Sequence, residues 1–287
     1  MSGLVEPFTT AFMQRALVAG LLVVVATSLV GTWVVVRGMT FLGDALAHGI
    51  IPGIAVASLV GFNLTLGAVL SAAVMIAGIR LVTQRSRLSE DAGIGLLFVG
   101  MLAIGVIVIS RSPSFTSDLT SFLFGDVLGV KGADLRVQAA AAALVAAGSV
   151  LSYRPFLALS FNPDKAATLG LAPRFSGGLL LVLVTGAIVA SFQAVGTLLV
   201  FGLLVGPPAT MVLFARRVPV IMVGSLGTGA VAVTGGLLVS YHLDTAAGAT
   251  MAGLSVAMFF LALLAREVRA LLAARRRPPA AGRPADR

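Results

Sequence analysis

The sequence predicts an all-α polytopic membrane protein with about nine transmembrane helices. Of its 287 residues, 58% are hydrophobic and only 11% are charged, and the mean hydropathy is +1.06. Apolar runs of about 18 residues or more recur along the chain, and each is long enough to cross a bilayer as a helix. The 33 glycines fit this class, because glycine lets membrane helices approach one another closely.

Short polar or glycine-containing turns divide the apolar runs into separate spans. We expect these spans at residues 12–36, 43–62, 64–82, 90–110, 133–152, 175–193, 196–214, 219–240 and 247–268. Residues 1–268 then form one transmembrane domain. If 175–214 is a single broken segment rather than two spans, the number falls to eight.

Capping and turn residues set the boundaries of the first four spans. Arg37 ends the first, and the turn at 61–63 separates the second from the third. Ser89 is a candidate N-cap of the fourth span. Glu90 and Asp91 follow it in the first turn, where the helix dipole favours acidic side chains.

Two segments are less apolar than the spans. Residues 111–131 contain Asp118 and Asp126 and are predicted to form an outer loop with a short surface or re-entrant helix at 117–128. Residues 269–287 are rich in Arg, Pro and Ala, and we expect a disordered tail there.

The longest polar passage between spans runs from 153 to 174. Asn162 can cap a short helix, Pro163 suits the first helical position, and Gly170 suits the position after the helix end. A short capped helix between two membrane spans is a candidate docking element, which we place at about 158–172.

The formal net charge of +9 reflects membrane orientation rather than nucleic-acid binding, because the cations lie in short loops and in the tail. Sixteen of the 20 lysines and arginines lie in the loops at 80–90, 153–174 and 216–218, at Arg37 or in the tail, and the other four are Arg15, Arg111, Lys131 and Arg136. The positive-inside rule then predicts a cytoplasmic C-terminus and, for nine spans, an outer N-terminus.

Asp44 and His48 are the main candidates for a functional site. They are spaced i, i+4, so they share one helix face. Ionisable residues at bilayer depth are energetically costly, so such a pair is a functional-site hypothesis by default. Pro52 continues the stripe and has no N–H for the carbonyl of His48, which predicts a free oxygen there. A carboxylate and an imidazole are half of an N2O2 shell for Zn²⁺ or Mn²⁺, and a two-fold dimer completes it.

The structural alternative is a helix N-terminus, in which Asp44 is a cap, His48 is a core residue and Pro52 causes a kink. Pro207 and Pro208 are further candidate kinks, because they remove donors for the carbonyls one turn earlier.

His242 and Asp244 form a second pair, in the outer loop before the last span. The favoured interpretation is structural, with Asp244 as the N-cap of that span. The alternative is a gating or access contact for a cation.

Several motifs are missing from the sequence. The chain has no cysteine, which excludes disulfides and thiolate metal sites. It has no G-x-x-x-x-G-K-[ST] motif to cradle ATP phosphates and no H-E-x-x-H motif. An intramembrane hydrolase is therefore disfavoured, and any ATP hydrolysis requires separate subunits.

Three stretches resemble the permease subunits of bacterial manganese/zinc-type (metal-ion) ABC importers. The first is Arg37–His48, and the second is Asn162–Gly170, which resembles the family's cytoplasmic coupling segment. The third is Val195–Thr210 together with Tyr241–Thr250. His242 and the Arg-rich tail depart from the family pattern.

This resemblance implies a type II ABC importer-like permease in the bacterial plasma membrane. The implied partners are cytoplasmic ABC ATPase subunits, an extracellular metal-binding protein, a second permease protomer and membrane lipid, but no nucleic acid. The implied metal ligands are Asp44 and His48, with Mn²⁺ or Zn²⁺ as transported ions and no permanently bound cofactor. The implied ATPase-coupling residues are Asn162, Pro163, Asp164, Lys165, Ala166, Leu169 and Gly170.

Two alternatives stay open at this point. One is an ABC permease for a chelated metal or siderophore, which would need a wide hydrophobic passage. The other is a proton-coupled secondary metal transporter, in which Asp44 and His48 would relay protons. The choice among manganese, zinc and iron is also open, because an Asp/His set accepts each of them.

Overall fold

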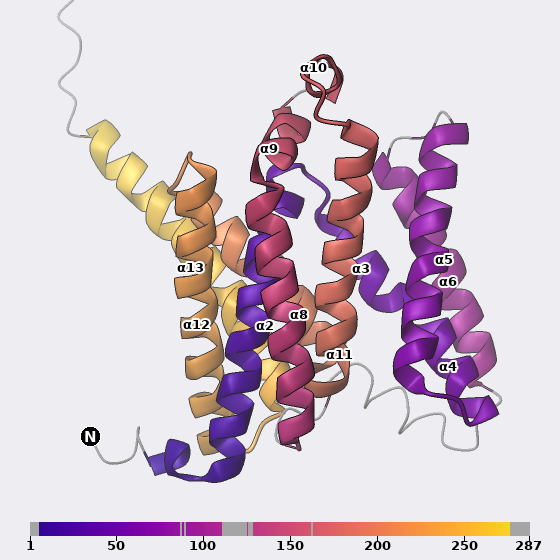
Figure 1. The fold of residues 1–287 in the computed structure, drawn as a ribbon. Coiled ribbons are helices and arrows are strands. Elements are labelled where there is room, and N and C mark those ends of the chain that lie inside the picture. The colour runs from indigo at the N-terminus through magenta and orange to yellow at the C-terminus, as the bar shows by residue number, and fades with distance from the viewer. Residues whose placement is uncertain are drawn as a thin grey trace, which may run out of the picture.

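The computed structural model describes residues 6–86, 88, 90–110, 125, 129–161 and 163–275. Within these ranges every regular element is a helix (Figure 1). The elements are η1 (Glu6–Thr9), α2 (Ala11–Val36), α3 (Thr40–Gly49), α4 (Ile51–Val60), α5 (Leu64–Arg85), α6 (Glu90–Ile109), α8 (Gly132–Leu151), α9 (Tyr153–Phe161), α10 (Pro163–Thr168), α11 (Pro173–Val212), α12 (Val218–Leu243) and α13 (Ala247–Arg275).

The number of spans agrees with the prediction. Nine helical stretches of the described chain are long and apolar enough to cross a membrane, with α3 and α4 forming one stretch and α11 forming two. The predicted helix 117–128 lies outside the described residues apart from Gly125, and the proposed N-cap Ser89 lies outside them too.

The helices form two groups that meet at α3. Helices α4, α5 and α6 pack on one another. Helices α2, α8, α12 and α13 pack around α11. Figure 1 shows α3–α6 on one side of the molecule and the larger group on the other. Helix α3 packs against both α6 and α11, so the residues of α3 lie where the two groups join.

The second span is broken in its middle. α3 ends at Gly49, Ile50 links the two helices, and Pro52 is the second residue of α4. Ser71 of α5 donates a hydrogen bond to the carbonyl oxygen of Gly49 at 2.7 Å. A side chain from a neighbouring helix thus satisfies a backbone acceptor at the break, as a low-dielectric environment requires.

Helix α11 is interrupted by a glycine, near the junction of its two membrane-spanning stretches. Gly196 has φ 75° and ψ 161°, while Pro207 and Pro208 lie inside the helix. The positive φ favours glycine, which lacks the Cβ that other residues would have to accommodate. The kinks predicted at Pro207 and Pro208 stay a prediction, and 175–214 forms two spans rather than one.

The C-terminal boundary also differs from the prediction. α13 continues to Arg275, past the expected domain end at 268, because residues 269–275 are Arg, Ala and Leu, which are strong helix formers. The rest of the predicted tail lies outside the described residues.

Candidate functional site

α3 exposes only two side chains over most of its length. From Leu42 to Pro52 every residue is buried except Asp44 and His48, whose side chains are 25% and 23% exposed. The buried residues pack against α11, α6 and α5. An acid and a histidine are therefore the only groups that this part of the second span presents to its surroundings.

The two side chains contact each other. Nδ1 of His48 lies 3.2 Å from Oδ1 of Asp44 and 3.1 Å from the Asp44 backbone oxygen. Both oxygens are acceptors, so Nδ1 is the nitrogen that donates. In a neutral imidazole this leaves the lone pair of Nε2 available, which is the arrangement of a metal-binding histidine oriented by a carboxylate.

Aromatic rings restrict the position of the imidazole. The ring of His48 meets Phe98 of α6 edge-on, with centroids 5.6 Å apart and an interplanar angle of 85°. Phe98 in turn packs against Phe41, with centroids 5.3 Å apart. Sequence reasoning did not identify Phe98, because its contact with His48 joins helices that are distant along the chain.

The free carbonyl expected at His48 is not observed. The N–H of Ile50 donates to this oxygen, because the chain turns at Ile50 instead of continuing as a helix. Pro52 itself is buried. This oxygen is therefore not part of the candidate site, which is limited to the side chains of Asp44 and His48.

Small residues of the second span serve packing. The backbone of Gly53 lies directly against that of Gly67 in α5, where either glycine would lack room for a Cβ atom. Gly49 faces the side chain of Met75, where a Cβ atom would fit tightly. These contacts hold α3 and α4 against α5 and so help to position the Asp44–His48 pair.

The structure does not bring His242 and Asp244 into this site. Within the described residues, no group of three or more His, Asp or Glu side chains is placed to hold a metal ion. The Nδ1 of His242 lies 2.8 Å from the carbonyl oxygen of Leu238, and its ring packs against Tyr241.

The predicted N-cap role of Asp244 was wrong. Asp244 follows the end of α12 with φ 51° and ψ 41°, and its N–H donates to the carbonyl of Ser240. α13 begins later, at Ala247. Asp244 is therefore the left-handed residue that ends one helix, a position that Asp tolerates better than most residues do.

The short helix predicted between Pro163 and Gly170 is α10, which α9 precedes, while its docking role stays a prediction. α9 and α10 lie at the end of the bundle opposite η1 (Figure 1). Gly170 has φ 71°, as expected for the residue after a helix, while Ala166 is buried and Leu169 is 70% exposed. Asn162 lies outside the described residues, as do the side chains of Pro163, Asp164 and Lys165.

An aromatic cluster links this element to α2. Trp33 of α2 is fully buried and meets Tyr153 and Phe156 of α9 edge-on, with centroids 5.5 and 5.6 Å apart. Trp33 lies one turn before the end of α2, and α3 follows after a short turn with Gly38 at φ 70°. A short packed path therefore connects α9 to the helix that carries Asp44 and His48.

Comparisons with known proteins agree with this architecture. The manganese transport system membrane protein MntC of Listeria monocytogenes is 34% identical over 267 residues, which cover 93% of this chain and 95% of that protein. A probable iron transport system membrane protein of Haemophilus influenzae is 32% identical over 266 residues, which cover 93% of this chain and 98% of that protein.

A solved structure shows the same fold. The structure described as PsaBC from Streptococcus pneumoniae in complex with Fab matches with a TM-score of 0.80 at 28% identity, covering 90% of this chain and 94% of that one. The family model described as the ABC 3 transport family matches residues 9–266. The chain therefore belongs to the ABC 3 transport family and is the membrane-spanning permease subunit of an ABC transporter.

Proposed function

We propose that this permease imports a divalent transition metal ion, Mn²⁺ or Zn²⁺, by alternating access, with the ion held between Asp44 and His48 of two protomers. The observation that carries the proposal is the isolation of this pair in an otherwise buried stretch of α3. Relatives named for manganese and for iron transport support a metal cargo.

The donor atoms match such a cargo. Each chain offers Oδ2 of Asp44 and Nε2 of His48, neither of which has a hydrogen-bond partner among the described residues. Two protomers related by a two-fold axis supply an N2O2 set, which suits Mn²⁺ and Zn²⁺. One protomer alone holds an ion weakly, and weak binding suits a carrier that must release its cargo.

The energy for transport comes from partner subunits. The ATPase subunits dock at α10 and its flanking residues, and an extracellular metal-binding protein delivers the ion at the opposite end of the bundle. Movement of α9 reaches α2 through Phe156 and Trp33, which pack together in the core. The protein lies in the bacterial plasma membrane with α10 and the C-terminus on the cytoplasmic side.

Uptake of radioactive manganese or zinc by cells that carry the complete transporter tests the site. Asp44→Ala and His48→Ala should each abolish uptake while the permease still copurifies with its ATPase. His242→Ala is the matched control and should keep uptake, since His242 is exposed and outside the site. Normal uptake by both site variants would refute the proposal.

The second candidate cargo is a chelated metal, which the iron-transport relative makes worth testing. Free Mn²⁺ in excess should suppress uptake of labelled Mn²⁺ more strongly than an iron chelate does. Stronger suppression by the chelate would favour the second candidate. Membership in an ABC transporter family removes the alternative of a proton-driven secondary transporter.

A further inference from the structure

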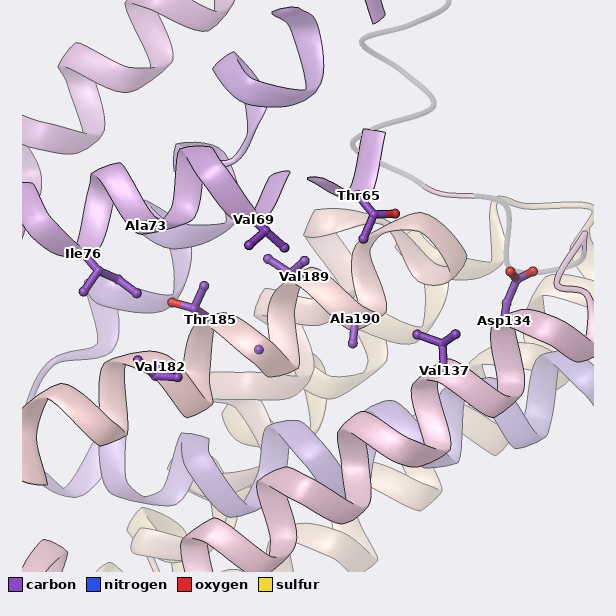
Figure 2. A pocket seen from close by; sticks show the side chains of 11 residues that line it. Thr65, Val69, Ala73, Ile76, Asp134, Val137, Val182, Thr185, Val189 and Ala190 are labelled. Carbon is purple, nitrogen blue, oxygen red and sulfur yellow. The ribbon is translucent and has the colours of Figure 1, made fainter. Parts of the chain in front are cut away.

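A continuous groove separates the two helix groups on one side of the molecule. One part, of about 540 Å³, lies between α5, α8 and α11 (Figure 2). A second part, of about 520 Å³, extends it along α5 and α11 to Arg80. The two parts share Ala73, Ile76 and Val182, so they form one passage.

The walls of this groove are apolar and open to the surroundings. Val69, Val137 and Val182 point into it (Figure 2) and are 46%, 61% and 56% exposed. At bilayer depth such a surface meets hydrocarbon rather than water. Thr65 and Asp134 lie at one end of the groove, and the opposite end is basic.

Arg80 forms the basic end, beside the first turn of α11. The guanidinium of Arg80 donates to the carbonyl oxygen of Arg174 at 3.0 Å, and it lies against Gly178, where a Cβ atom would collide with it. This bond uses one of five N–H donors. Arg80 forms no ion pair with another described residue, so its cation is available to an anion.

The positions of these groups match the dimensions of a lipid. Arg80 is three residues from the end of the Leu64–Thr83 span, and Arg174 is the second residue of the Pro173–Phe192 span. Both therefore lie near the membrane interface. From Arg80 to Val69 the helix rises by about 16 Å, close to half of the roughly 30 Å hydrocarbon core.

We propose that the groove binds an anionic phospholipid, with its phosphate on Arg80 and one acyl chain along α5 and α11. A second copy of this chain fits less well. A two-fold axis along the membrane normal would bring the same basic ends together at the same depth, where like charges repel. The lipid would occupy the space between the two helix groups, which goes beyond the proposed transport of a metal ion.

Photolabelling tests this proposal directly. The transporter complex is placed in phosphatidylcholine nanodiscs that contain a small fraction of phosphatidylglycerol with a diazirine on its acyl chain. Labelled peptides should map to α5 and to the first half of α11. A phosphatidylcholine probe with the same diazirine should label these peptides about fivefold less, since a single cationic side chain supplies that much preference for an anionic lipid.

Two pairs of variants complete the test. Arg80→Gln should reduce phosphatidylglycerol labelling to the level of the phosphatidylcholine probe, while Arg216→Gln should not. Gly186→Leu should fill the groove and remove labelling by either probe, because Gly186 lines the groove and a Cβ atom there has open space around it. Gly227→Leu, at an equally open glycine of α12, is its control.

The following outcomes would overturn the proposal. One is equal labelling by both probes, and another is unchanged labelling of Arg80→Gln and Gly186→Leu. The chain lacks cysteine, so Ala73→Cys introduces a single thiol into the groove. An efficient disulfide between two Ala73→Cys protomers would instead assign the groove to a second copy.

Discussion

Gly31 of α2 lies directly against the backbone carbonyl of Leu204 in α11, in a contact that leaves no room for a Cβ atom. Pro208 is four residues after Leu204 and cannot donate to this carbonyl. The freed oxygen therefore faces the Cα hydrogen of a glycine on a neighbouring helix, a weak hydrogen bond that recurs at helix–helix interfaces. Pro208 thus serves the packing of α2 on α11.

Replacement of Gly31 tests this packing. Gly31→Ala should destabilise the protein by about 1–3 kcal/mol, because the added methyl group forces the backbones of α2 and α11 apart. Thermal unfolding of the purified permease measures the effect. Gly227→Ala is the control, since a Cβ atom there meets open space, and it should not lower the unfolding temperature. Equal behaviour of the two variants would contradict the close contact.

The aromatic cluster at Trp33 predicts different effects on stability for two substitutions of this residue. The indole Nε1 is buried without a hydrogen-bond partner in the described part of the chain. Trp33→Phe should therefore be close to neutral, because it keeps an aromatic ring against Tyr153 and Phe156 and removes an unpaired donor. Trp33→Ala should cost about 3–5 kcal/mol through the cavity it leaves.

Thermal unfolding separates these two Trp33 variants, and the ratio of metal transported to ATP hydrolysed adds a functional measure. If the cluster links α9 to α2, Trp33→Ala should lower this ratio at temperatures where the complex stays folded, and Trp33→Phe should preserve it. An unchanged ratio in Trp33→Ala would show that the cluster supports the fold alone.

The shared metal site predicts a stoichiometry. A purified dimer should bind one Mn²⁺ per two chains, because each chain supplies one carboxylate and one imidazole. Equilibrium dialysis with metal analysis gives this number. A dimer in which one protomer carries His48→Ala should bind much more weakly, and a measured ratio of one ion per chain would show that a protomer is sufficient.

The left-handed backbone at Asp244 predicts the effect of glycine there. Asp244→Gly should preserve or raise stability by up to about 1 kcal/mol, because glycine carries no penalty at positive φ. Asp244→Val should lower the unfolding temperature. Metal uptake by Asp244→Gly distinguishes the two roles considered for this residue: retained uptake supports the structural one, and lost uptake supports a gating contact.

The sequence by itself determined the class, the number of spans and the main candidate pair. Hydropathy and helix length are local properties, so they predict where a chain crosses a membrane, and the i, i+4 spacing places Asp44 and His48 on one face whatever surrounds them. The glycine after α10 was predictable for the same reason, since a helix end depends on a few neighbouring residues.

Only the tertiary structure decided which surfaces those helices bury. The isolation of Asp44 and His48 depends on α5, α6 and α11 covering the rest of α3. The path through Trp33 and the hydrogen bond from Arg80 to the backbone of Arg174 join residues that are far apart along the chain. Such contacts depend on how whole helices pack, and the periodicity of a single helix carries no information about its partner.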